Sequence, residues 1–171
     1  MPTHNRDGDV SAMAFFNMAR EYRHAASQLL DLNKGCSFSN PINFLYFHAL
    51  ELTLKAFLRS FDRPIVGTGR KSHKLSQLYE ECQSLGLKIG SNDRVGIANI
   101  VSLLEAGNEE QGFRYFNLKS GPVPHLSWTR EVVEGLMHAV EPRVGVLDKQ
   151  GSAPAPPAKM TIIYGKPIPK R

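Results

Sequence analysis

The 171-residue sequence has no run of about 18 apolar residues, the length that a membrane-spanning helix requires. Its first ten residues lack the apolar core of a secretory signal peptide. Only two cysteines are present, Cys36 and Cys82, and neither lies in a CxxC pair or in a cluster with the spacing of zinc ligands. These absences predict a cytoplasmic protein with two free thiols, no metal site and no membrane association.

Most of the chain has little excess of positive over negative charge. Lys and Arg number 21 against 16 acidic residues, but the segment after Gln150 contains four basic residues and no acidic one. The first 150 residues therefore carry a net charge of only about +1 and have no basic stripe. Charge alone gives little support to nucleic-acid binding. The sequence also lacks a P-loop, GxGxxG, HExxH or an ordered Ser-His-Asp set, so no cofactor is predicted.

Apolar residues recur at the helical period in five segments, which predicts an all-α fold. The helices are expected over residues 11–32, 41–60, 72–85, 91–107 and 128–140. Asn40 caps the second and precedes a proline, Gly86 ends the third, Ser127 caps the fifth, and Pro142 and Gly145 end it.

Short connections between these segments favour an antiparallel up-down bundle of four to five helices. Residues 1–10 are expected to form a mobile leader and residues 11–145 the bundle. Residues 146–171 are expected to form a flexible, proline-rich basic tail, because five prolines follow residue 150 and prevent a long helix.

The helix over residues 41–60 is apolar on all sides, which is typical of a central, buried helix. Three polar residues, His48, Glu51 and Lys55, nevertheless lie along one stripe of it at i, i+3 and i+7. One interpretation is a Glu51–Lys55 ion pair on a strip that reaches solvent. The other is a polar pocket between helices or between two subunits, because buried charges require partners.

The string PINFLYFHALELTLKAFL, followed by SHKLSQLYEECQSLGL and later by FRYF, resembles HEPN-type helical domains (higher eukaryote and prokaryote nucleotide-binding). It is most similar to stand-alone bacterial and phage-borne members, over about residues 12–140. The matching residues are Phe44, His48, Ala49, Glu51, Leu54, Lys55, Ala56, Leu58, His73, Leu75, Leu78, Arg114 and Tyr115. The resemblance implies a bundle of four to five helices that often dimerises. Family members act on RNA, are toxin-like ribonucleases, bind nucleotides or serve as partners.

The nucleolytic branch of that family relies on an arginine followed by a histidine after four to six intervening residues. No pair in this chain has that spacing. The separation is shorter or longer in each of these arginine–histidine pairs: Arg20 and His24, Arg63 and His73, Arg70 and His73, Arg114 and His125, and Arg130 and His138. The sequence thus predicts a non-catalytic, homodimeric module that binds a nucleotide, RNA or a protein, and no catalytic residue is assigned. The alternative is a toxin-like or defence-associated ribonuclease with a non-standard site built from residues such as His48, Glu51 and Arg114.

Two sets of residues are candidate binding sites. The first is the pocket of His48, Glu51, Lys55 and Arg114, in which the guanidinium would bind the Glu51 carboxylate. The second is a basic cluster at the start of the third helix that either holds a phosphate or is a solvated loop: Arg70, Lys71, His73 and Lys74. A dimer is expected because residues 41–60 are apolar on more faces than one small bundle covers.

Overall fold

The computed structural model describes residues 10–32, 39–63, 74–89, 91–108 and 124–150. It contains five helices, α1 (Ala12–Leu32), α2 (Asn40–Arg59), α3 (Leu75–Ser84), α4 (Ser91–Asn108) and α5 (Leu126–Gln150). No strand occurs in these ranges, so the predicted all-α class is confirmed. None of the helices within them is long and apolar enough to cross a membrane. Residues 1–9 of the expected leader, the tail beyond residue 150 and Cys36 lie outside the described residues.

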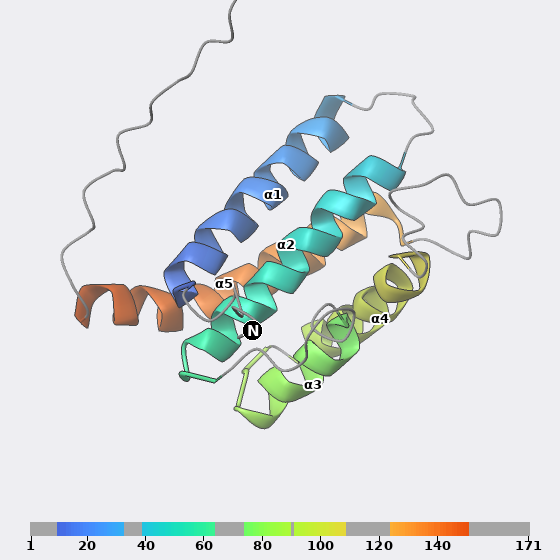
Figure 1. The fold of residues 1–171 in the computed structure, drawn as a ribbon. Coiled ribbons are helices and arrows are strands. Elements are labelled where there is room, and N and C mark those ends of the chain that lie inside the picture. The colour runs from blue at the N-terminus through green and yellow to red at the C-terminus, as the bar shows by residue number, and fades with distance from the viewer. Residues whose placement is uncertain (1–9, 33–38, 64–73, 90, 109–123, 151–171) are drawn as a thin grey trace, which may run out of the picture.

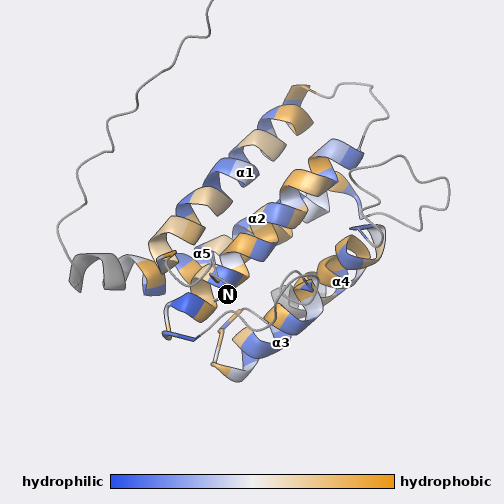
Figure 2. Cartoon of the chain, viewed as in Figure 1, coloured by the Kyte–Doolittle hydropathy of each residue, from blue (hydrophilic) through white to orange (hydrophobic). Residues whose placement is uncertain are grey.

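The five helices are arranged around α2 (Figure 1). Helix α1 lies beside it, α5 packs against both of them, and α3 and α4 cover another side of α2. Hydrophobic residues recur along α2 (Figure 2), and every residue from 49 to 58 is buried. The prediction that this helix is central is therefore confirmed. Because helices of the same chain already cover its apolar faces, those faces give no reason for a dimer.

The two ends of α2 are held in different ways. At its start Pro41 occupies the first turn, and the N-cap is Ser39 rather than the predicted Asn40. The Ser39 carbonyl accepts a hydrogen bond from the Asn43 amide at 2.8 Å. At the other end Ser60 is the C-cap, and Asp62 has the left-handed φ of 53° that stops the helix.

Arg143 of α5 binds this C-terminal end of α2. Its Nε donates to Ser60 Oγ at 2.9 Å and its Nη2 donates to the Ser60 carbonyl at 3.2 Å. The guanidinium carbon also lies 3.4 Å from the centre of the Phe61 ring. A cation at a helix C-terminus is favourable because it meets carbonyls that have no partner within the helix.

The predicted limits of α5 were wrong at both ends. The helix begins at Leu126, where the His125 carbonyl accepts a hydrogen bond from the Thr129 amide at 2.9 Å, so Ser127 lies inside it. It continues through Pro142 and Gly145 to Gln150. Pro142 removes one backbone hydrogen bond. The contacts of Arg143 and the burial of Val144 hold the helix together after that proline.

The apolar spacing of α1 and α4 includes one exposed residue in each helix. In α1, Phe15, Phe16 and Ala19 are buried, but Leu29 is 43% exposed. In α4, Val101 and Leu104 are buried, whereas Ala98 is exposed. The helical period therefore locates most of the buried face in both helices.

The end of α3 follows the prediction. Gly86 has φ 84°, the conformation that glycine adopts without strain. Its amide donates to the Gln83 carbonyl at 2.9 Å, and the Leu87 amide donates to the Cys82 carbonyl at 3.0 Å. These two bonds form the Schellman motif, and Leu87 is buried against the helix end.

We predict opposite effects for alanine at two glycines. A Cβ meets no atom within 4 Å at Gly86 or at Gly135, so conformation alone decides the outcome. Gly86→Ala should lower the free energy of unfolding by about 1–2 kcal/mol, because alanine is strained at this φ. Gly135→Ala, in the exposed interior of α5, should raise it by about 0.5–1 kcal/mol. Urea denaturation of both variants checks this, and a loss of stability in both would contradict it.

Candidate functional site

His48, Glu51 and Lys55, here called the α2 stripe, lie together as predicted. Lys55 Nζ is 2.9 Å from Glu51 Oε1, and the two side chains are 4% and 3% exposed. The interpretation as an ion pair on a solvent-facing strip is therefore wrong, because both charges are inside the bundle.

His48 is the end of the stripe that reaches the surface. Its Nδ1 lies 3.6 Å from Glu51 Oε2, and its side chain is 20% exposed. The ring packs against Tyr22 of α1 at 5.1 Å between centroids and edge-on against Phe44 at 4.5 Å. Glu51 thus faces Lys55 with one oxygen and His48 with the other. At 3.6 Å the carboxylate is close to Nδ1 but beyond hydrogen-bond length.

The stripe is not explained by stability alone. Removing two charges from water costs several kcal/mol per ion, and their attraction only offsets this when the geometry is good. Apolar residues of similar volume are often as stable as a buried ion pair or more so. The neighbouring residues Leu52 and Leu54 show that the same helix buries leucine readily.

The other predicted site residues are not brought to the stripe by the described structure. Arg114, Arg70, Lys71 and His73 lie outside the described residues. Lys74 is exposed and is the N-cap of α3, with no hydrogen bond from its side chain to the helix.

A carboxylate of this chain already lies at the start of α3. Glu105 of α4 accepts a hydrogen bond from the Ser76 amide through Oε2 at 3.2 Å. An amide that would otherwise attract a phosphate is thus bound to an internal anion, so the structure adds no support to the phosphate site predicted here.

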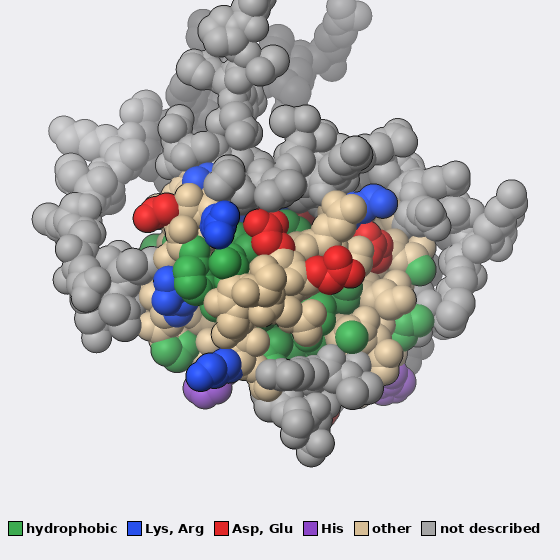
Figure 3. Space-filling model, turned by 90° about the horizontal axis from the view of Figure 1, so that it is seen from below, with side chains coloured by type: hydrophobic (Ala, Val, Ile, Leu, Met, Phe, Trp, Pro, Cys, Tyr) green, Lys and Arg blue, Asp and Glu red, His purple; other side chains and the backbone are tan. Residues whose placement is uncertain are grey.

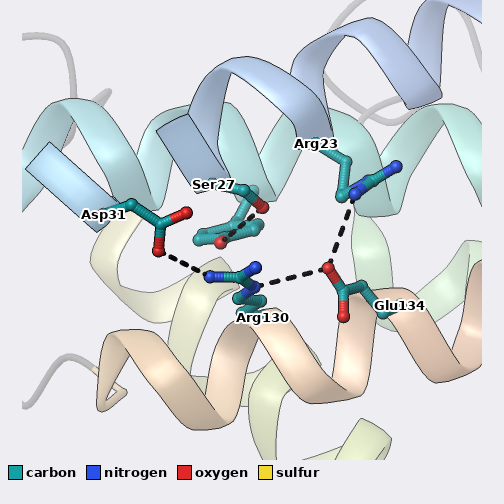
Figure 4. A network of polar contacts seen from close by, with 6 residues as sticks. Arg23, Ser27, Asp31, Arg130 and Glu134 are labelled. Atoms are coloured by element: carbon teal, nitrogen blue, oxygen red, sulfur yellow. Dashed lines mark hydrogen bonds and ion pairs between the residues drawn. The ribbon is translucent and has the colours of Figure 1, made fainter. Parts of the chain in front are cut away.

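Sequence reasoning missed a charged network between α1 and α5 (Figure 4). Arg130 Nη1 is 2.9 Å from Asp31 Oδ1, and Arg130 Nε is 3.4 Å from Glu134 Oε1. Arg23 Nη1 lies 3.5 Å from the same Glu134 oxygen. The spacing of Arg130 and Glu134 at i and i+4 was the one local signal for it. Arg23 is partly exposed and Asp31 is exposed, and both connect α1 to α5.

A buried hydroxyl pair belongs to the same region. The Tyr46 and Ser27 hydroxyls are 3.3 Å apart and join α2 to α1. Tyr46 is fully buried, and this burial raises the pKa of its phenol.

A groove of about 350 Å³ continues the α1–α5 boundary. It is lined by Phe16, Arg20, Arg23, Glu134, Met137, His138 and Glu141. The groove carries charges of both signs above two buried apolar side chains. None of the α2 stripe residues lines it.

The described residues contain neither a metal site nor a reactive thiol. No group of three His, Cys, Asp or Glu side chains among them is placed to hold a metal ion. Cys82 is free and buried, and its thiol donates to the Leu54 carbonyl at 3.5 Å. Burial raises the pKa of this thiol, so it stays protonated and unreactive.

Comparison of the chain with models of protein families, with curated proteins and with solved structures gave no match. The similarity to HEPN domains therefore stands on the motif residues alone.

We predict that the two classes of ion pair differ sharply in stability. Glu51→Ala leaves Lys55 buried without this carboxylate and should lower the free energy of unfolding by about 3–5 kcal/mol. Asp31→Ala removes a carboxylate from a pair whose side chains are 34% and 58% exposed, and should cost less than about 1 kcal/mol. Chemical denaturation measures both, and a small loss in Glu51→Ala would show that the stripe is solvated.

We predict that the free energy of unfolding depends on pH through the Tyr46 phenol, above the ordinary pKa of 10.0 for this group. The folded pKa is raised, so the unfolded state loses this proton first as the pH rises. The stability that Tyr46 contributes to the folded state is therefore fully present below pH 10.0, and it is lost as the pH rises toward the pKa of the folded state. Tyr46→Phe should cost about 1 kcal/mol at neutral pH, from the lost hydrogen bond to Ser27. Its deficit relative to the wild type should shrink in alkaline denaturation series, and a constant deficit would contradict this.

Proposed function

We propose that the chain is a small, non-catalytic, HEPN-like helical module with an up-down antiparallel bundle, which acts as a homodimer and binds a partner at the α2 stripe. The observation that carries the proposal is the buried Lys55–Glu51 pair aligned with the partly exposed His48. A buried ion pair is a costly feature of a central helix, and a role in binding gives a reason for keeping it.

The surroundings of His48 suit a partner with flat rings. Tyr22 and Phe44 are only half-buried, and their rings pack against the imidazole. Aromatic rings and histidine are the groups on which unpaired bases stack. Of the predicted partner classes (nucleotide, RNA and protein), this chemistry fits an unpaired base best.

Phosphate attraction contributes little to this binding. Figure 3 shows both acidic and basic side chains of the described residues on one face of the bundle. Lys55 is held by Glu51 inside the bundle and is not accessible to a phosphate. A contact made by stacking should therefore depend weakly on salt, unlike one made through many phosphates.

The second candidate function, a ribonuclease with a non-standard site, is favoured by one observation. A carboxylate hydrogen-bonded to Nδ1 orients a histidine for general acid–base catalysis, and Glu51 approaches that atom of His48 to 3.6 Å, just beyond hydrogen-bond length. The absence of the arginine–histidine spacing of the nucleolytic branch argues against it. The two functions differ in whether RNA stays intact in the presence of the protein or is cleaved.

We predict that the protein binds short single-stranded RNA and leaves it intact. Fluorescence anisotropy with a labelled oligonucleotide should show about tenfold weaker binding for His48→Ala, a loss within the range for one stacking contact. His24→Ala is the matched control, because His24 is an exposed histidine of α1. Equal binding by the wild type and His48→Ala would contradict the site.

The same samples test catalysis. RNA recovered after prolonged incubation with purified protein should remain full length on a denaturing gel. Cleavage by the wild type that disappears in His48→Ala would establish the ribonuclease instead.

A further inference from the structure

Among the side chains whose burial the structure describes, the exposed large hydrophobic ones lie on α1. Met18 is 44% exposed, Leu29 43% and Leu32 78%. Together with half-buried Tyr22 and exposed Ala25 they recur at steps of four, three, four and three residues. This is the spacing of a coiled-coil seam, in which one helix packs along another. We call these five residues the α1 seam.

The seam is distinct from the side of α1 that builds the core. The core side is formed by Ala12, Phe15, Phe16, Ala19 and Ala26. At 100° per residue the seam occupies a separate arc of about 80°. Arg23 and Asp31 pair with α5, so they point away from the seam. Figure 1 shows α1 at the edge of the bundle, with no other described helix on its outer side.

The apolar surface continues from the seam onto α2. Tyr22 belongs to the seam, and its ring packs against His48, which in turn contacts Phe44. Phe44 and its neighbour Leu45 are both half-buried. The contact between Tyr22 and His48 therefore joins the seam to the α2 stripe.

We infer that the α1 seam is the interface of a homodimer, in which a second copy of the chain lays its own α1 along it. The inference rests on the dimer in the proposed function and supplies its interface. Elsewhere the described surface offers no exposed large hydrophobic residue against which the seam could pack. A seam-to-seam contact about a two-fold axis sets apolar side chains against apolar side chains, and it closes at two copies.

Charge and size favour an antiparallel pair. Glu21 is exposed beside the seam, and a parallel pair would place it next to the partner subunit's Glu21. An antiparallel pair separates these like charges. It can also set small Ala25 against the partner subunit's Leu29, which places Tyr22 against the partner subunit's Leu32. The two Ala25–Leu29 layers then combine a small with a large side chain, as close helix packing requires.

The length of the seam indicates a reversible dimer. From Met18 to Leu32 it extends about 21 Å along the helix axis. A stable interface buries about 800 Å² on each partner. We expect a single seam of this length to give a dimer that dissociates on dilution.

Sedimentation velocity of the full chain tests the interface. The wild type should pass from a 19.0 kDa monomer to a dimer as its concentration rises through the micromolar range. Leu29→Glu and Leu32→Glu should remain monomeric where the wild type is dimeric, because each places a carboxylate in the apolar seam. The matched control is His24→Glu, an exposed position of the same helix about 120° from Met18, and it should still dimerise.

The outcomes separate this inference from the proposed function. A wild type that is monomeric at every concentration overturns both the dimer and the seam. A dimer that survives Leu29→Glu and Leu32→Glu overturns the seam and leaves a dimer through another face. If His24→Glu also loses the dimer, added negative charge anywhere on α1 is enough to prevent dimerisation, and the seam is overturned as well. Leu32 is so exposed that its substitution should leave the monomer folded, which circular dichroism verifies.

A mixing experiment tests the antiparallel orientation. Leu29→Glu and Ala25→Lys chains are each expected to be monomeric. Their mixture should form a heterodimer, because Glu and Lys then face each other in one layer while Ala25 and Leu29 meet in the symmetry-related layer. Failure of the mixture to dimerise overturns the antiparallel pairing.

Discussion

The burial of α2 on every side is the constraint on which the rest of the structure depends. A helix that is apolar all round is stable only when other helices surround it. Its few polar contacts therefore specify where those helices lie. Tyr46 bonds Ser27 of α1, the Leu54 carbonyl accepts from Cys82 of α3, and Ser60 binds Arg143 of α5. Hydrophobic burial supplies the driving force, and these contacts select one arrangement.

The two sets of charged residues contribute differently to stability because one set is partly exposed and the other is buried. The network of Asp31, Arg130, Glu134 and Arg23 is partly exposed, so each of its pairs is weak and screened by salt. The Glu51–Lys55 pair is inside the bundle, where salt has little access and the loss of one partner is costly. The outer network orients α1 against α5. The inner pair places a charged carboxylate behind His48.

The sequence predicted those features that depend on local order. The helical period located the five helices, and Gly86 marked an end where only a left-handed residue fits. The burial of Glu51 and Lys55 was undecided, because the same spacing occurs on surfaces and in cores. The bond between Arg130 and Asp31 joins residues 99 positions apart and leaves no local signal. The extension of α5 past Pro142 depends on the contact between Arg143 and α2. Helix propensity carries no information about such a tertiary contact.

Tyr22 connects the proposed binding site to the proposed interface. Its position in the sequence belongs to the α1 seam, and its ring packs against His48. A second copy that docks along the seam therefore changes the surroundings of His48, and a ligand on His48 changes one edge of the interface. Thermodynamic linkage makes the effect reciprocal: whatever free energy dimerisation adds to ligand binding, the ligand adds to dimerisation. If the chain dimerises through the seam and binds its ligand at His48, Tyr22 couples the two events through a direct contact, with no long-range change in the bundle.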